Sequence, residues 1–159
     1  MKGSGAVNKY DEMRYRQQEE FNKLPIKFAY GNDQFKKMMQ EFGLKENQTD
    51  KLYSLSSAGG YYLKTDAPKI KAWQKATTEE LSNAIAEDTT GEGFILDMFY
   101  SELCNHEYGY TMDDEYTLDA LGYTPKDIAT NPALKRGLEL AKQKILDEQS
   151  CDETMDMTM

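Results

Sequence analysis

Two side chains that often do chemistry in proteins lie close together in the chain. Cys104 and His106 fall within the segment LCNHEYGYTMDDEYTLDALGY at residues 103–123. His106 is the only histidine, and the second cysteine is Cys151. A thiol beside an imidazole is the arrangement of a cysteine nucleophile and its base. On a helix, however, residues two apart point about 200° away from each other. The spacing therefore argues against a Cys–His catalytic pair.

Cys104 and His106 are also residue types that bind metal ions. Glu102 and His106 are four apart, which suits two ligands on one helical face. A zinc site needs three or four ligands, and the chain has one histidine and two cysteines. The segment DTTGEGFILDMF at 88–99 lacks the acidic ligands that a calcium loop carries at its first, third and fifth positions. We expect no metal, no cofactor and no catalytic residue, and we interpret His106 as a residue near a helix end, where an imidazolium favours the dipole.

Charge is distributed very unevenly along the chain. The net charge is −9, from 28 acidic and 19 basic residues, yet residues 76–125 contain no lysine or arginine. Twelve acidic residues lie in that stretch: Glu79, Glu80, Glu87, Asp88, Glu92, Asp97, Glu102, Glu107, Asp113, Asp114, Glu115 and Asp119. Such a stretch argues against direct nucleic-acid binding, because phosphates must be neutralised by Lys and Arg, and we expect no direct nucleic-acid partner. It fits either a basic protein partner, attracted by electrostatic steering, or a solvated surface that maintains solubility.

Tyrosines lie beside these carboxylates, and the chain has eleven of them. Tyrosine offers contact area and a polar tip at protein interfaces, although it also fills cores. The predicted partner-binding residues are Asp97, Glu102, Glu107, Tyr108, Tyr110, Asp113, Asp114, Glu115 and Asp119.

The residue pattern predicts an α+β fold that is mostly helical. Helical spacing favours helices over 8–24, 33–42, 94–106 and 132–147, a short one near 115–122, and one kinked helix or two between 66 and 87. Gly59 and Gly60 indicate a turn between two strands in 51–66, and IKFAYG at 26–31 reads as a further short strand. We expect five to six helices and a small antiparallel sheet of two or three strands.

A single globular domain is expected over residues 8–147, because 159 residues suit one compact core. Residues 1–7 are predicted to be a flexible leader, and residues 148–159 a disordered acidic tail. The N-terminus has no apolar segment typical of a secretory signal, and no apolar run is long enough to span a membrane. The two thiols are therefore expected to be free, in a bacterial cytoplasm.

Four segments resemble, in order and spacing, an uncharacterised family of small acidic proteins carried by phages and conjugative elements of gut-type bacteria. They are KFAYGNDQFKKMMQEFGL, DKLYSLSSAGGYYLKTD, TTGEGFILDMFYSELCNHEYGYT and TLDALGY, and the resemblance covers roughly residues 8–145. The resemblance implies no known activity and no catalytic residues. Small acidic proteins on mobile elements often resemble, in charge, proteins that block host defence nucleases. This analogy suggests a protein that inhibits a host defence system, such as an anti-CRISPR or anti-restriction protein.

Two hypotheses follow. In the first, the chain is a non-enzymatic accessory protein whose carboxylates imitate phosphates and bind a basic host protein, such as a nuclease that handles nucleic acid. In the second, it is a small enzyme or ligand-binding domain with a site near His106 and Glu102, which requires a concave pocket. A third hypothesis is an accessory protein for DNA packaging or replication that works as an oligomer.

Overall fold

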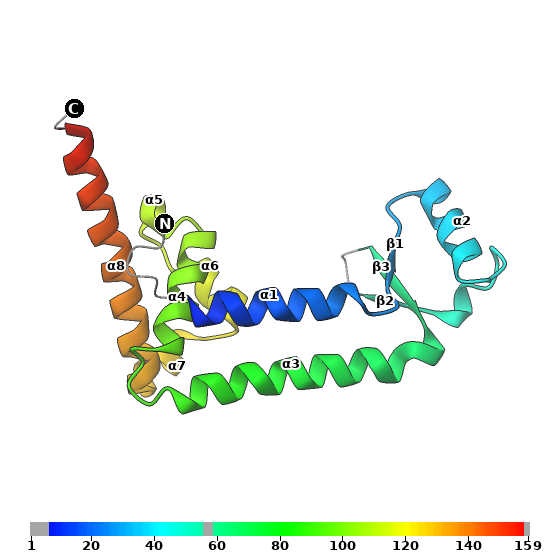
Figure 1. The fold of residues 1–159 in the computed structure, drawn as a ribbon, viewed down its shortest axis with the longest axis horizontal. Helices are drawn as coiled ribbons and strands as arrows, with labels where there is room; N and C mark the ends of the chain where they lie inside the picture. The colour runs from blue at the N-terminus through cyan, green and yellow to red at the C-terminus, as the bar shows by residue number, and fades with distance from the viewer. Residues whose placement is uncertain (1–6, 56–58, 158–159) are drawn as a thin grey trace. The chain divides into compact units, whose positions relative to one another are not determined.

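The computed structural model describes the backbone of residues 7–55 and 59–157, with side chains up to residue 149. It confirms the predicted class, a mostly helical α+β fold with one small antiparallel sheet. The described residues form eight α-helices rather than five or six (Figure 1). The additional helices are α5 (Tyr108–Thr111) and α7 (Pro125–Thr130), which are too short to show a helical period in the sequence.

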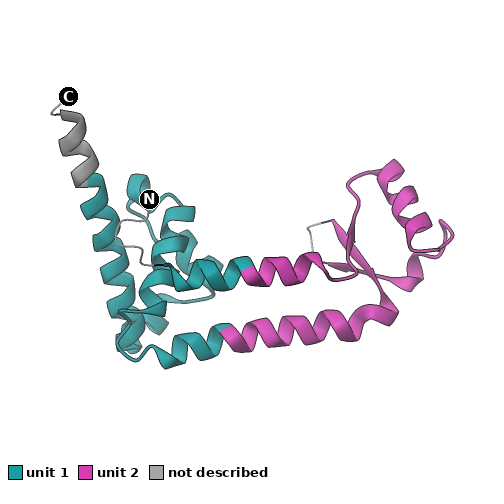
Figure 2. Ribbon diagram, viewed as in Figure 1, with its two compact units in different colours: residues 1–15, 81–159 teal, residues 16–80 magenta. Residues whose placement is uncertain are grey.

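The chain divides into two compact units (Figure 2). Unit 1 comprises residues 1–15 and 81–159, and unit 2 comprises residues 16–80. Two helices contribute to both units: α1 (Lys9–Asn22) and α3 (Ala67–Glu87). The single globular domain expected over residues 8–147 stays a prediction, because this division does not test it. The stretch from 66 to 87, where the sequence left one helix or two open, contains the single helix α3.

Unit 1 is organised around α4 (Phe94–Asn105), which packs along α8 (Pro132–Met157). The centre of its core is formed by Met98, Phe99 and Leu103, which have no exposed surface. The inner face predicted for the last helix is confirmed, because all four of its members are buried: Leu134, Leu138, Ala141 and Ile145. Burying side chains of this size from water is the main source of this unit's stability.

Helix α8 approaches the loop before α4 very closely. A Cβ atom placed on Gly137 would lie 2.4 Å from Cγ2 of Ile95 and 2.8 Å from the carbonyl oxygen of Gly91. Gly91 itself has a φ of +82°, in the left-handed region that favours glycine. Two glycines, one on each element, therefore allow the loop and the helix to touch.

Unit 2 contains the three-stranded sheet, in the order β1-β3-β2. Its strands are β1 (Lys27–Phe28), β2 (Leu52–Leu55) and β3 (Gly60–Leu63), all antiparallel. The predicted hairpin and the third strand are both present, and the turn residues 56–58 lie outside the described part. One face of the sheet packs on α2 (Asn32–Glu41), with Met38, Met39 and Leu52 buried between them.

The ends of α2 follow the sequence only in part. Gly43 has a φ of +75° just after the helix, as a glycine that ends a helix should. Asn32, a residue type that is favoured at N-caps, is the first helical residue. Gly31 occupies the capping position with extended backbone and no side-chain hydrogen bond. Asparagine and glycine are both common N-cap residues, so the sequence does not show which of these two neighbours takes that position.

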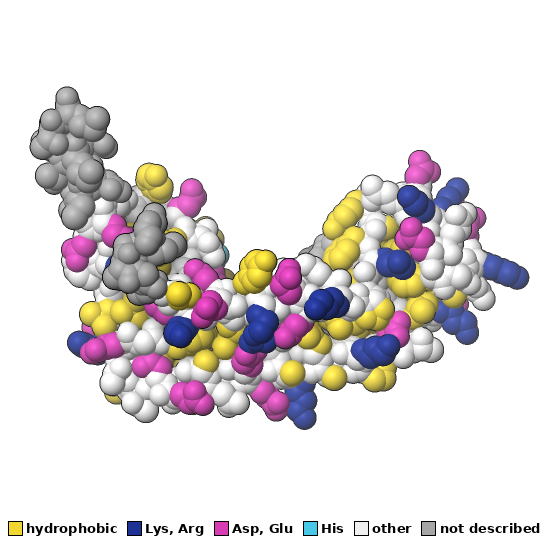
Figure 3. All heavy atoms as spheres, in the orientation of Figure 1, with side chains coloured by type: hydrophobic (Ala, Val, Ile, Leu, Met, Phe, Trp, Pro, Cys, Tyr) yellow, Lys and Arg dark blue, Asp and Glu magenta, His cyan; other side chains and the backbone are white. Residues whose placement is uncertain are grey.

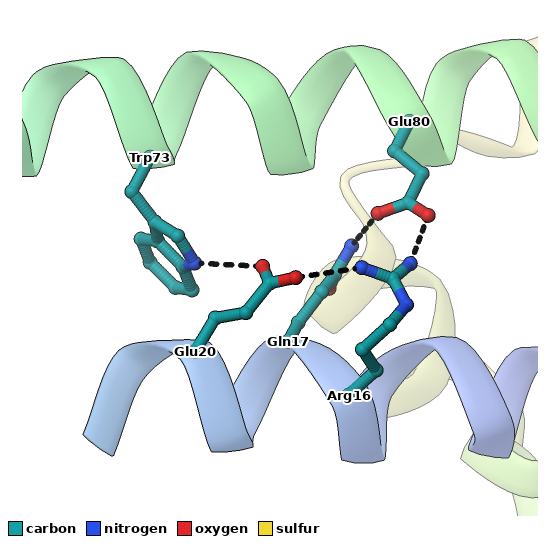
Figure 4. A network of polar contacts seen from close by, with 5 residues as sticks. All are labelled: Arg16, Gln17, Glu20, Trp73 and Glu80. Atoms are coloured by element: carbon teal, nitrogen blue, oxygen red, sulfur yellow. Dashed lines mark hydrogen bonds and ion pairs between the residues drawn. The ribbon is translucent and has the colours of Figure 1, made fainter. Parts of the chain in front are cut away.

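Within unit 2, α1 and α3 are joined by polar side chains (Figure 4). Arg16 donates to Glu20 at 2.9 Å and also pairs with Glu80. Gln17 donates to Glu80 at 3.0 Å, and the indole N–H of Trp73 donates to Glu20 at 3.2 Å. The carboxylates of Glu20 and Glu80 each accept through both of their oxygens, so this network holds two helices and is not a free site.

The ends of the chain differ from expectation in one respect. Helix α8 continues to Met157, past residue 147, where the folded part was predicted to end. The sequence after Gly137 contains no glycine or proline that would stop a helix, which accounts for the difference. Residues 1–6 of the predicted leader lie outside the described residues. Among the described residues, no helix combines the length and apolar character needed to cross a membrane.

Candidate protein-binding surface

Cys104 and His106 lie at the end of α4, as the spacing suggested. His106 is the residue that follows the helix, and its ring Nδ1 is 2.8 Å from the carbonyl oxygen of Glu102. A carbonyl oxygen can only accept, so Nδ1 carries a proton and donates it to the end of the helix. Burial raises the pKa of the Cys104 thiol, and the nearby carboxylate of Glu148 adds to the rise despite the Tyr100 hydroxyl. A raised pKa leaves little thiolate at neutral pH, which is unfavourable for a nucleophile.

Two of the predicted partner-binding carboxylates are occupied within unit 1. Asp97 accepts a hydrogen bond at 2.8 Å from the backbone N–H of Lys9, at the start of α1. Glu102 accepts from the hydroxyl of Tyr10, a buried side chain with 3 % of its surface exposed. Burial and the neighbouring Glu102 both raise the pKa of Tyr10, so its hydroxyl stays protonated and donates. These two carboxylates fix α1 against α4 and have little freedom to bind a partner.

Two more predicted residues also have structural partners. Tyr108 is buried in the core, with 5 % of its surface exposed. Asp114 forms an ion pair at 2.6 Å with Lys142, whose ammonium group lies over the ring of Tyr108. The pair is only partly exposed and joins the segment before α6 to α8. Tyr108 and Asp114 thus position the neighbouring surface rather than form it.

The remaining five predicted residues are exposed: Glu107, Tyr110, Asp113, Glu115 and Asp119. They lie just before α5, on α5, on the turn after it and on α6 (Glu115–Leu121). The structure adds two exposed residues that the prediction omitted, Met112 and Tyr116. We call these seven residues the acidic cap. Tyr116 was detectable from the sequence, because helical spacing places it opposite the buried Thr117 and Leu118 and one turn before Asp119.

The backbone of the acidic cap is shaped by two unusual residues. Glu107 and Met112, on either side of α5, have φ values of 58° and 59°. A left-handed conformation is uncommon for residues other than glycine. Both residues reverse the chain sharply, so that the four-residue helix between them projects Tyr110 outward with 87 % of its surface exposed. The Asp113 carboxylate then accepts from the backbone N–H of Glu115 at 2.8 Å and starts α6.

One hollow in unit 1 has a volume of about 310 Å³. It lies between the end of α3 and the start of α8, and its lining includes Ile85, Ile95, Pro132 and Asp88. Asp88 is its only titratable group, and its carboxylate accepts from the backbone N–H groups of Gly91, Gly93 and Ile95 at 2.9 to 3.0 Å. These bonds lower the pKa of Asp88 although burial acts in the opposite direction. A carboxylate so fully engaged supplies neither a base nor a metal ligand.

The segment DTTGEG at 88–93 is therefore an anchored loop and not a calcium loop. Within the described part of the chain, no group of three His, Cys, Asp or Glu side chains lies close enough to hold a metal ion.

Comparison with known proteins gives a family assignment. No curated protein and no solved structure matches the chain. A family of unknown function, DUF7659, matches residues 9–144, which include nearly all of α1 to α7 and the first half of α8. Because the match spans most of the 159 residues, the chain belongs to this family of unknown function.

Proposed function

We propose that the protein binds a basic partner protein through the acidic cap and has no catalytic role. The observation that supports this most directly is the mixture of exposed side chains between 107 and 119. Tyr110, Met112 and Tyr116 have 87, 55 and 69 % of their surface exposed, and four unpaired carboxylates surround them. Isolated exposed apolar residues are normal, but three within seven residues mark an interaction surface.

The chemistry of the cap indicates the kind of partner. Tyrosine and methionine provide large, adaptable contacts at the centre of interfaces. The carboxylates attract a positively charged surface and accelerate encounter with it. A protein that handles nucleic acid presents such a surface, because it must neutralise phosphates. We therefore propose a nucleic-acid-handling host protein as the partner, with carboxylates occupying the place of phosphates.

The finer proposal concerns the biological setting. If the chain acts for a phage or another mobile element, a partner of this kind would be a CRISPR or restriction nuclease, and the outcome would be inhibition. This part rests on the resemblance noted in the sequence and on the charge of the cap.

Binding can be tested with two matched triple variants. The cap variant carries Asp113→Asn, Glu115→Gln and Asp119→Asn, and the control carries Glu19→Gln, Asp50→Asn and Glu79→Gln on unit 2. Asp114 is left unchanged because its loss would leave Lys142 unpaired. Tagged wild-type protein should retain a basic protein from bacterial lysate at low salt, and the control should retain it equally. At about 0.5 M salt, where the screening length is only a few ångströms, retention should be lost.

The cap variant should bind the retained protein at least about tenfold more weakly, equivalent to about 1.4 kcal/mol. Undiminished binding by the cap variant would contradict the proposed surface. The anti-defence role is tested separately, by counting phage plaques on cells that carry a CRISPR or restriction system and express either form. Cells that express the wild type should show more plaques, because the inhibited defence no longer stops the phage, and cells that express the cap variant should not. An unchanged plaque count with binding intact would remove only the anti-defence role.

The enzyme hypothesis centred on His106 and Glu102 finds no supporting observation. The Glu102 carboxylate accepts from Tyr10, and the His106 ring donates to a backbone carbonyl. Neither side chain borders the hollow near Asp88.

A further inference from the structure

Unit 2 has the opposite electrostatic character to unit 1. It contains eleven basic and nine acidic residues, whereas unit 1 contains eight basic and nineteen acidic residues. The contrast sharpens between residues 23 and 75, with ten lysines and five acidic residues. Figure 3 shows lysine side chains projecting from the part that carries α2, with hydrophobic side chains exposed among them. The net charge of −9 for the whole chain conceals this basic region.

Most of these lysines are not neutralised by a neighbour. Within the described part of unit 2, three pair with carboxylates at 3.7 to 4.0 Å, namely Lys27, Lys36 and Lys69. The other seven are exposed and form no ion pair with a described residue: Lys23, Lys37, Lys45, Lys51, Lys64, Lys71 and Lys75. Only two acidic residues of the same region, Asp33 and Asp50, remain unpaired.

The sheet of unit 2 exposes aromatic rings on the face that α2 does not cover. The strand register places Tyr53 opposite Tyr62, and Phe28 and Leu55 on either side of Gly60. Paired residues, and residues two apart on one strand, share a face. The ring of Tyr30 stacks on that of Phe28, with centroids 6.4 Å apart and planes 13° from parallel, and therefore joins this face.

These rings are accessible to a ligand. Phe28, Tyr30 and Tyr53 have 41, 72 and 44 % of their surface exposed. The ammonium group of Lys64 lies 5.1 Å from the centre of the Tyr53 ring, so a cation accompanies the aromatic surface. The ring of Phe21 on α1 lies 6.4 Å from that of Phe28 and covers part of this face, whereas Tyr30 and Tyr53 stay exposed. An exposed sheet face normally carries polar side chains. Exposed rings with free lysines instead form the combination that binds single-stranded nucleic acid, whose bases stack on the rings while its phosphates meet the cations.

Two glycines keep the rings in place. A Cβ atom on Gly59 would lie 2.6 Å from Cε1 of Tyr30, and one on Gly60 would lie 3.0 Å from Cε1 of Phe28. Both rings thus lie directly against backbone that has no side chain, and a larger residue at either position would displace them.

We propose that this aromatic face of unit 2, formed by Phe28, Tyr30 and Tyr53 with Lys64, binds single-stranded nucleic acid. From the charge of residues 76–125 we expected no direct nucleic-acid partner. The aromatic face lies outside that stretch, and this proposal departs from that expectation. The inference is independent of the acidic cap, because it uses none of the same residues.

The test uses the full chain and a fluorescent oligothymidylate of about 12 nucleotides, a length within the range that small stacking sites cover. Fluorescence anisotropy at low salt should show saturable binding that weakens as salt is raised. The variant Tyr30→Ala/Tyr53→Ala should bind about 10- to 100-fold more weakly, since each stacked base contributes substantially. Tyr30→Phe/Tyr53→Phe keeps both rings and should bind as the wild type does.

The matched control is Tyr110→Ala/Tyr116→Ala, which removes two exposed tyrosines from the acidic cap and should leave binding to the oligonucleotide unchanged. The proposal is overturned if the protein does not bind the oligonucleotide at low salt. It is also overturned if Tyr30→Ala/Tyr53→Ala binds as tightly as the wild type with its far-ultraviolet circular dichroism intact, or if a duplex of the same length binds with equal affinity. Displacement of the oligonucleotide by an acidic peptide at equal concentration would also reject it, by showing a site for polyanions in general.

Discussion

Asp88 is expected to stabilise unit 1 by holding the loop before α4. Its carboxylate receives three backbone N–H groups that would otherwise lack partners at the start of that helix. Asp88→Ala should lower the free energy of unfolding by about 1–2 kcal/mol at pH 7, as loss of a helix cap does. Urea unfolding measures the change, and Asp33→Ala on the exposed first turn of α2 is the control, with a much smaller effect expected.

The same residue predicts a dependence on pH. Its hydrogen bonds to backbone lower the pKa of Asp88 in the folded protein despite the opposing effect of burial. The Asp88 carboxylate therefore contributes fully to the free energy of unfolding above the pKa of the unfolded state, near 3.9. This contribution disappears as pH falls through the lower pKa of the folded state. Wild type and Asp88→Ala should differ equally at about pH 7 and pH 5 and converge at about pH 3. A difference that persists or grows in acid would contradict this.

Tyr10 gives a second prediction for a single residue. Its ring is buried against Phe94, at a centroid distance of 5.9 Å, and its hydroxyl donates to Glu102. Tyr10→Phe retains the ring but leaves the carboxylate without that donor, so we expect a loss of about 2 kcal/mol in unfolding free energy. Tyr110→Phe changes a hydroxyl that is exposed and should have no measurable effect. Equal stability of both variants would show that water replaces the donor to Glu102.

Among the secondary-structure elements, the contact between α8 and the loop before α4 is the most sensitive to a small change. Alanine has the better helix propensity, by about 1 kcal/mol. At position 137, however, its Cβ would overlap Ile95 and the backbone of Gly91. Gly137→Ala should therefore destabilise the protein by about 2 kcal/mol or more. Glu139→Ala, at an exposed position of the same helix, should change stability little. Thermal unfolding of both variants compares them, and a stabilised Gly137→Ala would refute the close contact.

The elements that the sequence predicted well are those whose residues carry a local signal. The four inner positions of α8 recur at helical spacing, and Gly59-Gly60 separates two strand-like runs. Helix α5 carries no such signal, because its position depends on left-handed backbone at Glu107 and Met112, two residues that rarely adopt it. The polar composition of residues 148–159 favours a disordered tail, which stays a prediction, while the backbone of α8 extends to Met157.

Prediction of the binding surface was limited by contacts between distant parts of the sequence. Asp97 and Glu102 have partners at Lys9 and Tyr10, and Asp114 has its partner at Lys142. Acidic composition indicates how many carboxylates are present, but only the fold decides which of them remain free. For the same reason the aromatic face of unit 2 was not predicted, since the strand register brings together rings from 28, 30 and 53.

Charge also sets how the whole molecule responds to salt. Unit 1 carries nineteen acidic and eight basic residues, and its described part contains two ion pairs, Glu92–Arg136 and Asp114–Lys142. Screening weakens ion pairs and also weakens repulsion between like charges. Because unpaired carboxylates far outnumber the pairs, relief of repulsion should dominate. The midpoint of thermal unfolding should therefore rise by about 3 °C between about 10 mM and 300 mM sodium chloride, equivalent to about 1 kcal/mol for a chain of this length.

The cap variant Asp113→Asn/Glu115→Gln/Asp119→Asn distinguishes this explanation from a general effect of salt on hydrophobic burial. With three fewer negative charges, it should have a higher midpoint than the wild type at low salt and a smaller rise as salt is added. A general effect would instead leave the two curves parallel, because both proteins bury the same apolar surface. A midpoint that falls with salt would mean that the ion pairs outweigh repulsion, and the uneven charge would then contribute to binding without a cost to the fold.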